Sequence, residues 1–373
     1  MEWDGELGLT IVAKTEGSMN SKQLPLVSVV TPVYNNAEYL AQCIESVLAQ
    51  TYPNWDYTIV NNCSTDGTGE IARRYAAKNP RIRVHENTQF LRAVPNHNHA
   101  LRQISPESKY CKIVFGDDWI FPHCLEEMVA VAEQHPSVGI VGAYGLWEVV
   151  ADGGDEYVVM LGGLPYPTRS VSGLNACRRM FLEELYIFGT STSVLYRSDL
   201  VRTRDPFYNE GNIHADTEAC VMLLKSCDFG FVHQILTFTR GRREALGMTS
   251  VDMQMDFGCR LHTLATHGSD FLNGDEFQFC QERLLRGYYN FLGLSVMRGR
   301  RDKKFWDFHK RKLNESVGFS RTRLAKAILS RTFRAVLNPY ETVGKLLESR
   351  RHVAIKKAEQ ERTHTITVGV NSE

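Results

Sequence analysis

Two adjacent carboxylates, Asp117 and Asp118, directly follow the apolar segment 112–115, which the sequence predicts as a β-strand. Neighbouring carboxylates repel each other unless a cation lies close to them. Mg²⁺ and Mn²⁺ bind carboxylate oxygens together with the phosphate oxygens of a substrate. The pair therefore indicates a metal–diphosphate site. The alternative is a loop that caps a helix starting near Pro122, because acidic residues are favourable at helix N-termini.

The segments that must position this pair alternate between strand and helix over the first 120 residues. This alternation is typical of βαβ units and of a mostly parallel sheet, in which ligands bind beyond the carboxyl ends of the strands. The expected strands are 26–31, 57–60, 81–85 and 112–115, and the expected helices are 39–50, 68–78 and 96–103. We therefore expect three polar loops to meet at one edge of the sheet, namely 31–35, 61–68 and 116–119.

The rest of the chain continues this pattern and then becomes helical. Further strands are expected at 138–141, 157–161, 191–196 and 230–239, with helices at 174–185 and 215–227. From 251 to 360 the pattern is almost wholly helical. The sequence thus predicts an N-terminal extension (1–24), an α/β domain (25–250) and a helical, basic C-terminal region (251–373).

Composition excludes several classes of protein. Apolar residues make up 43% of the chain and charged residues 23%, so it is neither disordered nor of low complexity. The nine cysteines include no CxxC and are expected to be buried thiols of a reducing compartment. With no leader-like segment and no apolar stretch of membrane-spanning length, we expect a cytoplasmic protein, or one on the inner face of a membrane. The sequence contains no nucleophile-elbow, dinucleotide-binding or Walker A motif.

A series of spaced motifs resembles the family 2 glycosyltransferases. The motifs occur in the family's order within residues 26–250 and are densest in the first hundred: Val29–Asn35, Tyr39-Leu40, Cys43–Leu48, Gln50–Pro53 and Ser64–Thr68. The resemblance implies the nucleotide-sugar-binding fold called GT-A, with a mostly parallel sheet flanked by helices. It also implies an inverting transfer of sugar from a nucleotide sugar, for which a UDP-sugar is the expected donor.

The resemblance also assigns residues to the donor nucleotide. Thr31, Pro32 and Tyr34 would wall the base. Asn62 stands where the family has an acidic residue that reads a pyrimidine ring, and its carbonyl can accept a hydrogen bond from a ring N–H without charge. Arg92 is expected to contact the base or a phosphate, and the alternative is a solvated loop arginine.

By the same resemblance, Asp117 faces the ribose or the metal and Asp118 is the main ligand of a Mg²⁺ or Mn²⁺ cofactor. The family's acidic motif usually reads Asp-x-Asp-Asp; here Phe115 occupies its first position, so only Asp117 and Asp118 remain. Near the end of the domain, Arg240–Arg243 and Met248–Ser250 are similar to a loop that closes over the diphosphate in relatives, which suggests that one of these arginines binds phosphate.

An inverting transfer needs a general base that takes the proton from the acceptor hydroxyl. In the family this base is a carboxylate that opens a helix, and the matching residue here is Asp216, with Glu218 as the second candidate. The alternative is that Asp216 only caps the helix and that Glu218 pairs with a lysine. His214 could contact the acceptor or could be an ordinary loop histidine.

These assignments predict the transfer of a single sugar to a hydroxyl of a glycan or lipid-linked glycan, in polysaccharide biosynthesis. The processive polymerase signature Gln-x-x-Arg-Trp is absent. The second hypothesis is a non-catalytic nucleotide- or sugar-binding protein on a decayed GT-A scaffold, for which Asn61, Asn62 and Phe115 would be the signs of decay.

Charge is unevenly distributed along the neutral chain. Residues 297–362 contain 19 Lys and Arg against 7 Asp and Glu, a balance of +12, so the rest carries −12. Within 321–357, apolar residues return at helical intervals between basic ones, which suits an anionic membrane surface. The alternatives are a helix packed on the acidic body and a disordered end. Nucleic acid is not expected as a partner, because aromatic residues are sparse here and no reader motif is present.

Overall fold

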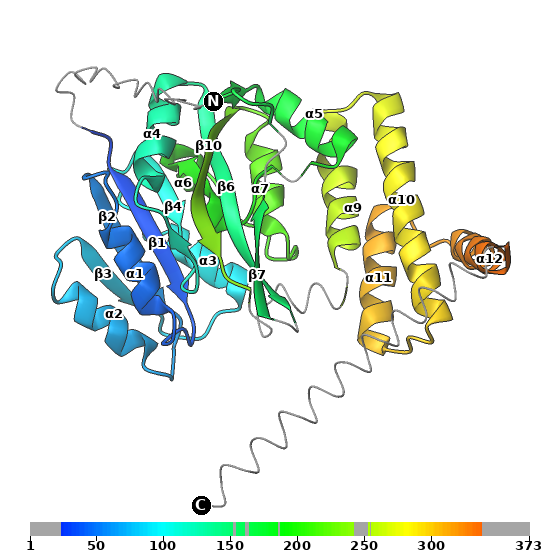
Figure 1. Ribbon diagram of the computed structural model, residues 1–373, viewed down its shortest axis with the longest axis horizontal. Helices are drawn as coiled ribbons and strands as arrows, with labels where there is room; N and C mark the ends of the chain where they lie inside the picture. The colour runs from blue at the N-terminus through cyan, green and yellow to red at the C-terminus, as the bar shows by residue number, and fades with distance from the viewer. Residues whose placement is uncertain are drawn as a thin grey trace, which may run out of the picture.

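A computed structural model of the chain describes residues 24–151, 154–160, 164–185, 187–241, 253 and 255–337. Ten strands of these residues form one sheet, with the order β3-β2-β1-β4-β9-β6-β10-β5; β7 pairs with β6, and β8 pairs with β10 (Figure 1). Their bounds are β1 Val27–Val33, β2 Trp55–Asn61, β3 Ile82–Glu86, β4 Tyr110–Ile113, β5 Trp119–Ile120, β6 Val138–Ala151, β7 Gly154–Met160, β8 Ser170–Val171, β9 Val194–Arg197 and β10 Asp228–Thr239.

The first four long strands pair in parallel, as the alternation of strand and helix predicts. The second half is mixed, because β9 runs antiparallel between β4 and β6 whereas β6 and β10 pair in parallel. The expected α/β fold with a largely parallel sheet is thus confirmed in its N-terminal half, and an antiparallel strand enters its C-terminal half.

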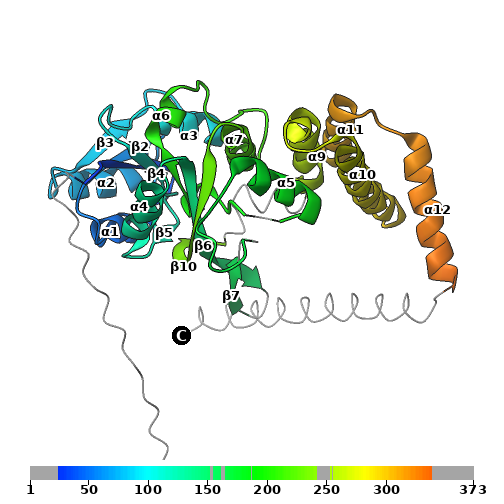
Figure 2. The same ribbon diagram turned by 90° about the horizontal axis from the view of Figure 1, so that it is seen from above.

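Helices cover both faces of the sheet (Figure 2). Alternate residues of β1 point to opposite faces, so that Val29 joins a core with α1 and α4, whereas Val30 joins the core on the other face with α3 and α7. These elements are α1 Leu40–Leu48, α2 Thr68–Ala76, α3 Ala93–Leu101, α4 Cys124–Gln134, α5 Gly173–Glu183, α6 Ser198–Arg202 and α7 Ala215–Leu223. All seven residues of β1 are buried, which explains why most of its sequence is apolar.

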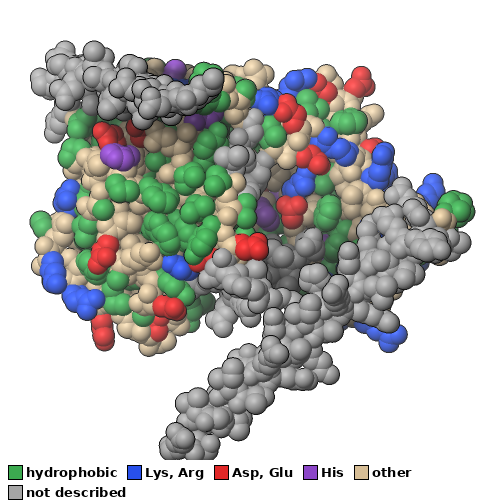
Figure 3. Space-filling model, viewed as in Figure 1, with side chains coloured by type: hydrophobic (Ala, Val, Ile, Leu, Met, Phe, Trp, Pro, Cys, Tyr) green, Lys and Arg blue, Asp and Glu red, His purple; other side chains and the backbone are tan. Residues whose placement is uncertain are grey.

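A second group of helices extends the core on the side of α5 and α7: α9 Asp256–His267, α10 Gly274–Met297, α11 Lys303–Ser316 and α12 Arg321–Leu337. On the face shown in Figure 3, acidic and basic side chains are intermingled over this region. α12 packs along α10, where Ala327 lies against Gly293. Among the described residues, no helix is both long and apolar enough to cross a membrane.

One expected strand is partly wrong. Residues 191–193 form a 3-10 turn, η1 (Ser191–Ser193), and the strand β9 begins only at Val194. The run of hydroxyl residues favours a turn because Ser and Thr side chains bond to nearby backbone groups. Here Thr190 and Ser193 cap the turn reciprocally. The turn contains residues that contact both candidate catalytic carboxylates.

Candidate active site

The adjacent carboxylates lie between β4 and β5, at the edge of the sheet that the sequence predicts. Asp118 is only 2% exposed. Its two oxygens accept hydrogen bonds from the hydroxyl of Thr192, at 2.6 Å, and from the backbone N–H of Arg240, at 3.0 Å. Burial, together with the neighbouring charge of Asp117, raises the pKa of Asp118 to about 8.

These properties fit a divalent cation. Burial and a neighbouring carboxylate both disfavour the ionised form of a carboxyl group. A bound cation would offset that free-energy cost. Asp117 is half-buried, so part of its side chain is exposed. Among the described residues no group of three or more His, Cys, Asp or Glu side chains that could hold a metal ion occurs, and Asp117 and Asp118 are the two carboxylates that would bind one.

Asp216 lies in the first turn of α7 and contacts the same 3-10 turn as Asp118. Its carboxylate accepts hydrogen bonds from the backbone N–H of Thr217, at 2.7 Å, and from the backbone N–H of Ser191. Burial raises the pKa of Asp216, and these N–H groups partly oppose the rise. Because Ser191 and Thr192 are consecutive, the two carboxylates, about 100 residues apart in sequence, are brought to one place.

A buried lysine donates hydrogen bonds to this turn and to the start of β9. Lys112, in β4, is fully buried, and its ammonium group donates to the carbonyl oxygens of Thr192, at 2.5 Å, and Val194, at 3.1 Å. Burial lowers the pKa of Lys112. The sequence predicted 112–115 as a strand but not the role of Lys112, because the pattern of a strand does not show which buried groups a lysine within it contacts. The signal was a single cation inside an otherwise apolar run.

Arg240 is the arginine of the 240–243 segment that the structure places at the site. It follows β10, and its guanidinium donates to the backbone oxygen of Asp117, at 3.2 Å, and to Gln42, at 2.9 Å. The guanidinium also stacks over the ring of Tyr39, with its carbon 4.3 Å from the ring centroid. The other residues of the predicted closing loop, 242–250, lie outside the described residues.

The residues assigned to the nucleotide base differ in accessibility. Thr31 is fully buried, and its hydroxyl accepts a hydrogen bond from Tyr57, at 2.8 Å, so its side chain faces the core. Pro32 is also buried within β1. Tyr34 is 46% exposed and packs edge-on against Phe90, with ring centroids 4.8 Å apart. Of these three residues, only Tyr34 offers a side chain to a ligand.

The side chain of Asn62 is occupied by its own loop. It is 2% exposed. Its oxygen accepts hydrogen bonds from the backbone N–H of Leu91 and from Asn87, both at 2.9 Å, while its amide donates to the Leu91 carbonyl. An amide oxygen has two lone pairs, so Asn62 has none left for a base N–H. The geometry therefore gives Asn62 a structural part in place of the expected base contact. Arg92 is exposed at the start of α3 and is available to a ligand.

Glu218, the second candidate for the base, is held by hydrogen bonds within the fold. It is 3% exposed, and two asparagines donate to it: Asn212 at 2.8 Å and Asn209 at 3.0 Å. His267 and His262 of α9 lie 3.4 and 3.5 Å from its carboxylate. Burial opposes ionisation, yet these hydrogen bonds hold the pKa of Glu218 well below its usual range. A carboxylate this acidic is a poor proton acceptor, and its partners are not the lysine that the alternative interpretation proposed.

Comparisons with known proteins concern mainly the N-terminal part of the chain. Residues 28–155 match the family model described as glycosyl transferase family 2. The candidate glycosyltransferase EpsE of Bacillus subtilis (strain 168) is 40% identical over 119 residues, which are 32% of this chain and 42% of EpsE. Glycosyltransferase GlyG of Streptococcus pneumoniae serotype 4 is 31% identical over 119 residues, 32% of this chain and 39% of GlyG. The chain thus spans less than half the length of these relatives.

The fold also resembles a solved structure, that of S. aureus TarS residues 1–349 in complex with UDP-GlcNAc. The TM-score is 0.56 at 17% sequence identity, covering 78% of this chain and 80% of the TarS chain. At this identity the likeness concerns the fold alone, and it extends into the helices beyond the family match. Residues 28–155 are accordingly the part of this chain that is similar to glycosyl transferase family 2.

Proposed function

We propose that this chain transfers a sugar from a nucleotide sugar to a hydroxyl of an acceptor, with inversion at the anomeric carbon. The observation that carries the proposal is the turn Ser191–Ser193, which binds Asp118 through a hydroxyl and Asp216 through a backbone N–H. The carboxylate proposed for the donor and the carboxylate proposed for the acceptor thus both contact this short segment. The retention of Asp117, Asp118 and Asp216 favours an enzyme over a decayed, non-catalytic scaffold.

In this mechanism Asp216 accepts the proton of the acceptor hydroxyl while that oxygen bonds to the anomeric carbon. The bond from the anomeric carbon to the diphosphate oxygen breaks on the opposite face, and the electron pair leaves with the nucleotide. The raised pKa of Asp216 makes its carboxylate a stronger base. The N–H groups of Ser191 and Thr217 fix the orientation of that carboxylate. A Mg²⁺ or Mn²⁺ ion bound by Asp117 and Asp118 would neutralise the charge of the leaving diphosphate.

For the donor, we propose that Tyr34 and Arg92 meet the nucleotide and that Arg240 lies beside its diphosphate. The exposed ring of Tyr34 can pack against a base, and the guanidinium of Arg240 is held next to Asp117. UDP is the first nucleotide to test. GDP, CDP and dTDP are compared with it, because the oxygen of Asn62 is already bonded within its loop and other groups would have to select the base.

The test is calorimetry with these four nucleotides, with and without Mn²⁺, followed by an assay of nucleotide release from the matching sugar donor. Asp118→Ala is expected to abolish metal-dependent binding, whereas Asp216→Asn is expected to keep binding and lose transfer. Asp307→Asn, an exposed change on α11, serves as the control. Full turnover by Asp216→Asn would exclude the assigned base, and metal-independent binding of every nucleotide would exclude the metal.

We further propose that α12 contacts an anionic membrane surface, where a lipid-linked acceptor would be found. Its 17 residues include five arginines and lysines and no acidic residue. Leu329, Phe333 and Leu337 follow one another at intervals of one helical turn and are 65–67% exposed, on the side away from the buried Ala327. Apolar side chains flanked by cations suit such a surface, where each basic residue contributes on the order of 1 kcal/mol. The rest of the predicted segment, 338–357, lies outside the described residues.

Co-sedimentation with vesicles tests this contact. Binding is expected to vesicles that contain phosphatidylserine and not to pure phosphatidylcholine, and the double variant Leu329→Asp/Phe333→Asp is expected to lose it. Phe279→Asp, a change of another exposed aromatic residue on α10, is the matched control. Equal binding of the double variant and the wild type would reject the contact.

A further inference from the structure

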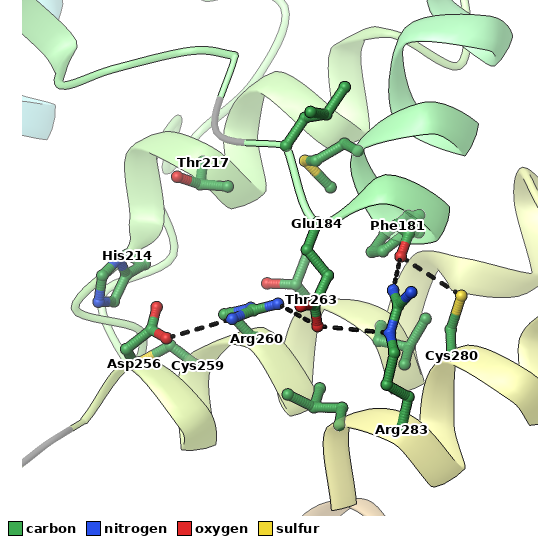
Figure 4. Close-up of a pocket in the computed structure, with 14 residues that line it drawn as sticks. Phe181, Glu184, His214, Thr217, Asp256, Cys259, Arg260, Thr263, Cys280 and Arg283 are labelled. Carbon is green, nitrogen blue, oxygen red and sulfur yellow. Dashed lines mark hydrogen bonds and ion pairs between the residues drawn. The ribbon is translucent and has the colours of Figure 1, made fainter. Parts of the chain in front are cut away.

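A cavity of about 240 Å³ lies between α5, α7, α9 and α10 (Figure 4). All of these helices lie outside the 28–155 segment that matches the family model. Apolar side chains form much of its wall, and three of them, Phe181, Leu264 and Leu284, are less than 10% exposed. The cavity is therefore a feature of the part of this chain that is not shared with the family domain, and its surface favours an apolar occupant.

The charged residues of the cavity neutralise one another. Glu184 pairs with Arg260, at 2.9 Å, and with Arg283, at 3.4 Å. Arg260 in turn lies 3.6 Å from Asp256. Figure 4 shows this chain of ion pairs running from Asp256 through Arg260 and Glu184 to Arg283 across the middle of the view. Two carboxylates and two guanidinium groups leave no formal charge, so the site has no excess charge with which to hold a phosphate or a carboxylate.

The cavity borders the candidate base. His214 and Thr217, which lie on either side of Asp216 at the start of α7, both line it. The backbone N–H of Thr217 donates to the carboxylate of Asp216, at 2.7 Å. An acceptor whose hydroxyl reaches Asp216 would therefore lie beside two residues that line this cavity.

We propose that the cavity receives an uncharged, mainly apolar group of the acceptor, attached next to the sugar whose hydroxyl Asp216 deprotonates. The inference rests on the proposed function, and it narrows the acceptor class to glycosides that carry an aryl or short alkyl group. An engineered protein cavity of roughly 150 Å³ binds benzene, so a cavity of this size accommodates one substituted ring. The occupant's apolar surface leaves water on binding, which favours such glycosides over the bare sugar.

The test uses the full chain with UDP and Mn²⁺ and compares three probes by calorimetry: phenyl, methyl and 4-carboxyphenyl β-D-glucopyranoside. We expect the phenyl glucoside to bind at least tenfold more tightly than the methyl glucoside. We expect the added carboxylate to remove most of that gain, because the cavity has no unpaired cation for it among the described residues.

Two variants fill the cavity, Leu264→Trp at its buried wall and the half-buried Met180→Trp, which disturbs packing less. Both are expected to abolish the preference for phenyl over methyl. Leu329→Trp, the same type of change at an exposed site on α12, is expected to keep it. Retained nucleotide binding shows in each case that the chain is folded.

The outcomes separate this inference from the proposed function. Equal affinity for the phenyl and methyl glucosides, no binding of either, or a preference that survives both tryptophan variants would overturn the cavity assignment, even if donor turnover depends on Asp118 and Asp216. Conversely, a preference abolished by both tryptophan variants in a chain without donor turnover would support the cavity and reject the transferase proposal.

Discussion

Glu218 and Asp216 are two residues apart on α7, and substituting each by its amide is expected to change stability in opposite directions. Glu218→Gln keeps the shape of the side chain but removes its charge. The amides of Asn212 and Asn209, at 2.8 and 3.0 Å, then donate to a neutral acceptor. The imidazoles of His267 and His262 lose the carboxylate that they face across the contact between α7 and α9.

The magnitude follows from these contacts. A hydrogen bond to a charged group contributes about 1.5–3 kcal/mol and one between neutral groups about 1 kcal/mol, so two weakened bonds cost about 2 kcal/mol. The lost imidazole contacts add to this, and we expect a loss of about 2–3 kcal/mol. At about 2.1 cal/mol/K of unfolding entropy per residue, a chain of 373 residues would then show a fall in the melting temperature of about 3–4 °C.

The pH dependence has a definite sign. Hydrogen bonding holds the pKa of Glu218 in the folded state below its ordinary value of 4.5. Its stabilising contribution is therefore complete above pH 4.5 and is lost as the pH falls through the folded-state pKa. The difference between wild type and Glu218→Gln should be constant near pH 7 and should shrink below pH 4.5.

Asp216→Asn is the matched comparison. Burial raises the pKa of Asp216 above its ordinary value of 3.8, so its ionised form opposes folding once the pH exceeds that value. The asparagine variant should be as stable as the wild type, or more stable, at pH 7, yet inactive in transfer. Calorimetric melting curves and nucleotide-release assays of both variants measure the two effects. If Glu218→Gln melts like the wild type and loses transfer, while Asp216→Asn unfolds early, the two roles have been assigned the wrong way round.

Three further predictions concern the turn and the thiols. Thr192→Val removes the hydroxyl that donates to Asp118 and should weaken Mn²⁺-dependent UDP binding about ten- to a hundredfold in calorimetry, whereas Thr192→Ser should retain it. Lys112→Met should lower the melting temperature, because the carbonyl oxygens of Thr192 and Val194 lose a buried donor, and should weaken the same binding by releasing the turn; normal binding would exclude this role of the lysine. All nine cysteines are free thiols and only Cys63 is not fully buried, so iodoacetamide should modify one thiol in the native chain and nine after unfolding, as counted by mass spectrometry.

Local sequence was sufficient for much of the architecture. Runs of β-branched residues such as those of β1 have the length and composition of buried parallel strands. Helical spacing predicted α1 and α2 close to their observed bounds and predicted the start of α7. The position of Asp117 and Asp118 followed from the same reasoning, because the loops after parallel strands meet at one sheet edge. Short elements such as β5 and β8, of two residues each, were missed because two residues carry no periodicity.

The roles of individual polar residues depended on the tertiary structure. Asn62, Glu218 and Lys112 have partners in Asn87, His267 and Thr192, which lie 25, 49 and 80 residues away in sequence. Neither residue type nor spacing reports whether such a side chain is already satisfied. The sequence by itself determined which strands form and where their polar ends gather, because those depend on local pattern. Only the folded chain decided that the turn after Thr190 joins Asp118 to Asp216, because that contact exists only when β4, β9 and α7 are packed together.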